Sequence, residues 1–89
     1  MRIKKGFVLR EVCGEQVIMG EGVNALDFGR LLCLNETAAW LWNQARASEE
    51  FTVEGLADAL CGVYDVTPEQ ARLDVEKIVN EWKKVNVVE

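Results

Sequence analysis

Apolar residues in the first third of the chain are clustered in short runs of the length that β-strands have. Residues 7–13 are rich in Phe, Val and Leu, residues 16–19 form a second apolar run, and residues 30–34 form a third. Runs of this kind, separated by turn-forming residues, are typical of strands. Residues 20–29 contain three glycines, an Asn and an Asp, which indicate a loop. We therefore predict three strands, with a loop between the second and the third.

The link between the first two strands is short enough for a tight hairpin. Gly14 and Glu15 are compatible with a two-residue turn of type II′, which favours glycine at its first central position. In that register Val12 lies opposite Val17. The alternation of apolar and polar residues is imperfect, but the short link favours an antiparallel pair.

A helical pattern follows the third strand directly. Asn35 is a favourable N-cap because its side-chain oxygen can accept from a backbone N–H one turn later. Glu36 then lies in the first turn, where the helix dipole favours a negative charge. The apolar residues recur at helical spacing and should share one face. They are Ala38, Leu41, Trp42 and Ala45. Because Trp40 and Trp42 are both so large, we expect this helix to occupy the centre of the core.

Two more helices are predicted in the second half of the chain. The first of them is capped by Thr52. The next has the clearest start in the sequence, with Thr67 as N-cap, Pro68 at the first helical position and Gln70 where a capping box requires it. Asn86 can end this helix, since Asn tolerates the left-handed conformation. Its apolar stripe consists of Ala71, Val75, Ile78, Val79 and Trp82.

The order of the elements, three strands and then three helices, predicts an α+β fold in a single domain that spans residues 1–89. A small antiparallel sheet cannot bury enough surface by itself, so the helices should pack on one of its faces. A chain of 89 residues that is 49% hydrophobic and 28% charged suits one small globular domain.

The charge of the chain narrows the class of partner. A net charge of −5 and a pI of about 4.7 argue against a nucleic-acid partner, because such binding depends on Lys and Arg that neutralise phosphates. No run of about 18 apolar residues and no signal-peptide pattern is present, so we expect no membrane partner. The expected location is the cytoplasm.

The sequence offers little for catalysis or metal binding. It contains no His, and Cys13, Cys33 and Cys61 are widely spaced with no C-x-x-C pair. We expect three buried, reduced thiols and no bound metal or other cofactor. The carboxylates, Asp74 among them, are scattered at positions typical of solvated charges. No catalytic constellation is visible, so we expect a protein that is not an enzyme.

The third predicted strand has a feature that bears on function. If the strands pair in chain order, residues 30–34 lie at an edge of the sheet with free N–H and C=O groups. Residues 31–34 contain neither charge nor proline, which natural edge strands usually carry. One interpretation is that the core or a loop covers this strand. The other is that it receives a peptide as an added strand.

An ordered series of segments resembles the PqqD family over residues 7–88. No single motif is diagnostic, but the series as a whole is fairly specific. The matching segments are residues 7–12, 34–38, 41–42, 52–54, 56–57, 60, 64–66, 74–75 and 78–79.

The resemblance implies a winged helix-turn-helix-like fold and a role in recognising ribosomally made, post-translationally modified peptides. Members of the family hold the leader segment of a precursor peptide as an added strand between the third strand and the third helix. They present it to a modifying enzyme, often of the radical-SAM type. The resemblance therefore implies a peptide-binding groove between these two elements, although the apolar stripe of the helix must also serve the core. The implied groove residues are Arg30, Leu31, Leu32, Cys33, Leu34, Val75, Ile78, Val79 and Trp82.

Two other functions are compatible with the same pattern. One is a winged-helix DNA-binding protein, since a fold of this type does not fix the function. Against it, the third helix mixes its basic residues with four acidic ones and forms no basic stripe. The basic residues are Arg72, Lys77, Lys83 and Lys84. The other function is a small homo-oligomeric scaffold that pairs with itself through the free strand edge.

Overall fold

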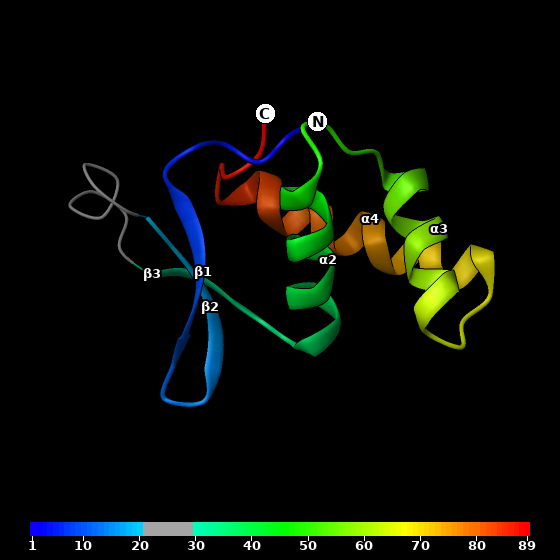
Figure 1. The fold of residues 1–89 in the computed structure, drawn as a ribbon, viewed down its shortest axis with the longest axis horizontal. Helices are drawn as coiled ribbons and strands as arrows, with labels where there is room; N and C mark the ends of the chain where they lie inside the picture. Colours follow the sequence, from blue (N-terminus) through cyan, green and yellow to red (C-terminus); the bar gives the residue numbers. More distant parts are fainter. Residues whose placement is uncertain (21–29) are drawn as a thin grey trace.

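The computed structural model describes residues 1–20 and 30–89, with Arg30 and Leu31 described by their backbone alone (Figure 1). Within these ranges three strands are followed by three helices, which confirms the predicted α+β order. The elements are β1 (Phe7–Val12), β2 (Glu15–Gly20), β3 (Arg30–Leu34), α2 (Glu36–Ala47), α3 (Val53–Val63) and α4 (Pro68–Lys84). The loop predicted over residues 20–29 lies, apart from Gly20, outside the described residues.

The three strands form one antiparallel sheet in the order β1-β2-β3. In Figure 1 the sheet stands at one end of the molecule and α3 at the other, with α2 between them. The last helix, α4, runs along the length of the molecule past both. This arrangement leaves β3 at an edge of the sheet, as the order of the strands in the sequence predicted.

The hairpin between β1 and β2 has a different register from the one predicted. Val12 lies opposite Glu15, so the two turn residues are Cys13 and Gly14 rather than Gly14 and Glu15. Both have positive φ angles, 53° and 81°, as a type I′ turn requires. The prediction of a type II′ turn was wrong because glycine occupies the second central position, and Cys13 adopts the left-handed conformation at the first.

Side-chain oxygens cap the beginning of all three described helices, as predicted. The bonds join Asn35 to the N–H of Ala38 at 2.8 Å, Thr52 to that of Gly55 at 3.0 Å and Thr67 to that of Gln70 at 3.2 Å. The capping box expected at α4 is not completed. The side chain of Gln70 donates instead to Asp74, at 2.8 Å. Since Asp74 lies one turn further along the helix, its carboxylate offers Gln70 an acceptor without a turn back towards the cap.

The C-terminal end of α4 is closed by Asn86, which has a φ of 62° and thus the predicted left-handed conformation. The backbone N–H of Val87 donates to the carbonyl oxygen of Trp82 at 3.2 Å, and the N–H of Asn86 donates to the carbonyl oxygen of Lys83 at 3.1 Å. This pair of bonds is the Schellman pattern, which satisfies carbonyls that the helix itself leaves unpaired.

The two ends of the chain pair with each other as a short antiparallel ladder (Figure 1). Arg2 and Glu89 exchange two backbone hydrogen bonds of 2.8 Å each, and Lys4 donates to Val87 at 2.9 Å. The side chains of Arg2 and Glu89 also form an ion pair at 2.9 Å. Nothing in the sequence pattern indicated this pairing, because each half of it is only a few residues long.

The core is built around an aromatic cluster. Trp42 of α2 and Trp82 of α4 meet edge to face, with their centroids 5.3 Å apart, and Phe51 approaches Trp82 at 6.0 Å. The two tryptophans are fully buried. Trp42 thus confirms the prediction that its helix lies at the centre of the core. The same prediction was wrong for Trp40, which is half-buried. Its ring packs against that of Tyr64, with the two ring centroids 5.9 Å apart.

Among the described residues, no helix combines the length and the apolar character needed to cross a membrane.

Loss of the α2 cap and loss of the central aromatic ring should have different effects on stability. Asn35→Ala should lower the free energy of unfolding by about 1 kcal/mol, because one backbone N–H loses its acceptor. Trp42→Ala should lower it by about 3–5 kcal/mol, because it leaves a cavity in the core. Urea titrations measure both values. Equal and negligible losses would show that the strand-to-helix junction does not organise the fold.

The β1–β2 turn allows a stabilising substitution. Cys13→Asn would create the Asn-Gly pair that type I′ turns favour, and Asn tolerates a positive φ better than Cys does. We expect the free energy of unfolding to rise by about 0.5–1 kcal/mol. Asn would relieve only a part of the strain that the left-handed conformation imposes on Cys13. The matched control is Cys61→Asn within α3, where φ is helical and no gain should follow. A loss of stability at residue 13 would contradict the turn type.

Candidate functional site

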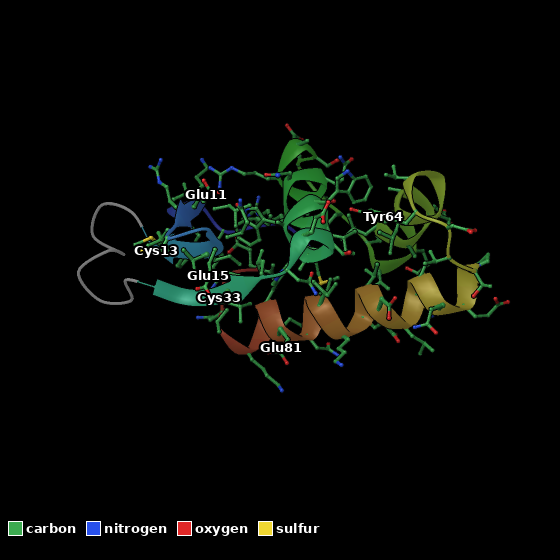
Figure 2. The ribbon with its side chains drawn as sticks, turned by 90° about the horizontal axis from the view of Figure 1, so that it is seen from below. Glu11, Cys13, Glu15, Cys33, Tyr64 and Glu81 are labelled. Carbon is green, nitrogen blue, oxygen red and sulfur yellow. The ribbon has the colours of Figure 1, made fainter. Side chains whose placement is uncertain are left out.

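A groove lies between the edge strand β3 and helix α4. It has a volume of about 450 Å³, and its floor and rim come from β3, the start of α2 and one side of α4. The lining residues are Leu32, Cys33, Leu34, Asn35, Thr37, Ala38, Asp74, Lys77, Ile78, Glu81 and Trp82. β3 lies beside the C-terminal half of α4, and the two elements run in nearly opposite directions (Figures 1 and 2). Five of the nine residues implied by the family resemblance are thus brought together here.

One wall of the groove is the free edge of β3. Among the described residues, β3 pairs with β2 alone, so its outer backbone groups face the groove. Leu32 lies opposite the fully buried Ile18 and shares the core-facing side of the sheet with Leu34. Adjacent side chains of a strand point to opposite faces. Cys33 therefore points to the other face, where its thiol lies 3.7 Å from a carboxylate oxygen of Glu15 (Figure 2).

The beginning of β3 is irregular. Arg30 lies opposite Met19 and Leu32 opposite Ile18, so Leu31 is the extra residue of a bulge. A bulge increases the twist of an edge strand and limits the length over which a new strand can pair. The straight part of the free edge is therefore Leu32 to Leu34.

The apolar stripe of α4 divides between the groove and the core. Val75 and Val79 are 0% and 1% exposed and lie in the core rather than among the groove residues. Ile78 is half-buried and lines the groove. Trp82 belongs to both, since its buried ring packs on Trp42 and also borders the groove floor.

A charged rim on α4 is the part of the site that sequence reasoning missed. Asp74, Lys77 and Glu81 line the groove beside Ile78. Asp74 was expected to be a solvated charge, but it is half-buried and accepts from Gln70. The signal was present in the spacing: positions 74, 78 and 81 fall on one side of a helix. This spacing indicates a binding site only when the structure shows that β3 faces the same side of α4.

The thiols are more accessible than predicted. Cys13 and Cys33 are exposed and Cys61 is half-buried, so the expectation of three buried thiols was wrong. The reasons are local, because Cys13 lies in a tight turn and Cys33 points away from the core. Among the described residues, no group of three or more His, Cys, Asp or Glu side chains could hold a metal ion.

Comparisons with known proteins give two matches. The model of the family described as "Coenzyme PQQ synthesis protein D (PqqD)" matches residues 15–88. No curated protein matches the sequence. The fold is similar to that of a solved structure described as TbiB1 in complex with the TbiA(beta) leader peptide, with a TM-score of 0.76. The two sequences are 17% identical, and the match covers 100% of this chain and 95% of the other.

The accessibility of the thiols can be tested directly. In the folded protein, Cys13 and Cys33 should react rapidly with Ellman's reagent, and Cys61 should react more slowly because its side chain is partly covered. Single Cys→Ser variants assign each phase. Three thiols that all stay protected until urea is added would contradict the exposed positions.

Proposed function

This chain belongs to the PqqD family, and on that premise we propose that it binds the leader segment of a precursor peptide by strand addition. In this function it is an adaptor without catalytic activity, as befits a peptide-recognition domain of that family. The observation that carries the proposal is the outer edge of β3, which pairs with no other described strand and faces Ile78 and the charged rim of α4 across an open groove.

The chemistry of the two walls suits an extended peptide. The outer N–H and C=O groups of residues 32–34 can form a ladder with a new strand, which supplies affinity independent of sequence. Alternate side chains of that strand would point towards α4, where the half-buried Ile78 and the neighbouring Leu32 of β3 provide an apolar surface. Such a surface supplies selectivity through the side chains that it accepts.

The similarity to TbiB1 supports the same function. That protein is described as a complex with a leader peptide, and its fold covers the whole of this chain. At 17% identity the support comes from the shared arrangement of sheet and helices and not from shared side chains. The groove residues of this chain are therefore argued from its own geometry.

We further propose that the bound leader is presented to a peptide-modifying enzyme, of radical-SAM or another type. The support for this partner is the family resemblance, in which peptide recognition serves a separate modifying enzyme. Because the precursor is made on ribosomes, the proposal places the protein in the cytoplasm. Genes for a short peptide and a modifying enzyme beside the gene for this chain would identify the candidates to test.

The alternative of a winged-helix DNA-binding protein predicts a different result in a simple assay. A filter-binding assay with duplex DNA should show no retention, because the groove side of α4 carries Asp74 and Glu81 as well as Lys77. The self-pairing scaffold predicts a dimer through β3. Size-exclusion chromatography with light scattering tests it, and the leader should then compete with dimer formation.

Strand addition predicts a specific pattern in an amide NMR titration with the leader of a neighbouring precursor peptide. Shifts should concentrate in residues 30–34 and along residues 74–82, because these segments form the two walls of the groove. Ile78→Ala should weaken binding, since Ile78 offers the apolar contact on α4. Leu73→Ala is the matched control on the same helix, because Leu73 is 60% exposed and lies outside the groove.

Two outcomes would contradict the proposal. If the leader binds but shifts other segments and leaves both walls unchanged, strand addition at this groove is wrong. If no candidate leader binds at micromolar concentrations, the adaptor function itself fails.

A further inference from the structure

The rim of the groove points to the type of leader that it accepts, an inference that rests on the proposed function. We propose that the groove selects a strand with an apolar residue flanked, two positions before and two positions after, by Lys or Arg. The apolar residue contacts Ile78, and the two cations pair with Asp74 and Glu81.

The spacing of these three residues on α4 carries the argument. At 1.5 Å per residue, Asp74 lies about 6 Å before Ile78 along the helix axis, and Glu81 lies about 4.5 Å after it. At 100° per residue, the two carboxylates project within about 20° of each other around the helix. They therefore form one row, with Ile78 turned further towards the core, where it is half-buried.

An added strand matches this row. Residues of a strand that point to the same face are spaced about 6.8 Å apart, twice the rise per residue. A side chain over Ile78 would thus have its neighbours at positions −2 and +2 close to the two carboxylates. Lys and Arg side chains are long enough to absorb the difference of one or two ångströms. In Figure 2, β3 lies beside the C-terminal half of α4, and the groove continues past Leu34 to Asp74. A strand that pairs with β3 and extends past Leu34 therefore runs along this row.

The pattern is nearly symmetric about the apolar residue. Either direction of the bound strand places one cation at each carboxylate, so the inference holds for parallel and antiparallel pairing alike. Lys77 also lines the groove. It projects about 40–60° further from the core than the two acids do, which places its charge at the outer lip.

Both carboxylates are able to accept a cation. Asp74 accepts one hydrogen bond, from Gln70, and an ionised carboxylate has several acceptor positions. Glu81 contacts Lys84 at 3.6 Å, but both side chains are well exposed, and an exposed pair of this kind is weak enough to be exchanged for another. The net charge of −5 also favours the approach of a basic peptide.

Ion pairs at an exposed rim contribute modestly to affinity and more to selectivity. From the usual strength of such pairs, each carboxylate should change affinity by about two- to five-fold. The strand ladder and the apolar contact supply the remainder. Peptides with the two cations should therefore bind more tightly than peptides without them, but the cations should not be required for binding.

A displayed library of random 12-residue peptides tests the inference. It is selected in parallel on the wild-type protein, on the double variant Asp74→Lys/Glu81→Lys, and on the control Glu69→Lys/Glu76→Lys. The control has the same spacing and the same change of charge on α4, but at exposed positions outside the groove. Thermal unfolding confirms that each variant is folded. The neutral variant Asp74→Asn/Glu81→Gln replaces the charge reversal if that one does not fold.

The wild-type and control selections should enrich peptides with Lys or Arg two positions on each side of an apolar residue. The charge-reversed variant should enrich Asp or Glu there, and the neutral variant should lose the preference for either charge. Binders that shift the amides of residues 32–34 but show no charge preference, or the same preference in all variants, would overturn this inference and leave the proposed function standing. A wild-type selection that enriches no peptide would overturn both.

Discussion

The packing of Trp82 against Trp42 and Phe51 determines where α4 lies, and the groove depends on that position. Trp82 is fully buried, and its edge-to-face contacts tie α4 to α2 and to the segment before α3. Within the described residues neither Trp42 nor Trp82 has a protein hydrogen-bond partner for its indole N–H. The contact therefore depends on burial of the large rings and on their preferred edge-to-face geometry. Because Trp82 also borders the groove, the core and the candidate site share one side chain.

Because Trp82 serves both regions, the apolar residues of α4 divide between the core and the groove. Val75 and Val79 face the centre of the core and hold the helix in place. Ile78 lies at the margin of the same stripe, and the neighbouring charges begin where burial ends. A helix that packs against its neighbours by one face necessarily has such a margin on each side. Here one margin faces β3, whose outer edge pairs with no other described strand, so the candidate groove lies at a boundary between core and solvent.

Sequence reasoning was most successful where the determining interactions are local. The caps at Asn35, Thr52 and Thr67 and the left-handed Asn86 each involve residues within one or two turns, and all were found where the pattern indicated. The turn at Cys13 was misplaced by one residue, because glycine suits either central position and the backbone choice depends on strand twist.

The remaining features depend on tertiary contacts and could not be read from local spacing. The stripe on α4 was visible as a set, but its separation into Val79 in the core and Ile78 in the groove required the position of β3. The exposure of Cys33 follows from which face of the sheet the helices cover, and the role of Asp74 follows from what lies opposite it. In each case the sequence shows the chemistry of the residue but not which residues lie next to it in the folded chain.

The ladder between the two ends of the chain has a consequence for how this chain can be joined to other proteins. Arg2 and Glu89 lie side by side and take no part in lining the groove. A domain whose ends adjoin can be inserted into a surface loop of another protein, or circularly permuted with a short linker, with little strain on its core. Fusion to a catalytic domain at either end would leave the strand edge of β3 open. The same module is therefore suited to act as a separate protein or as a built-in segment of a larger enzyme.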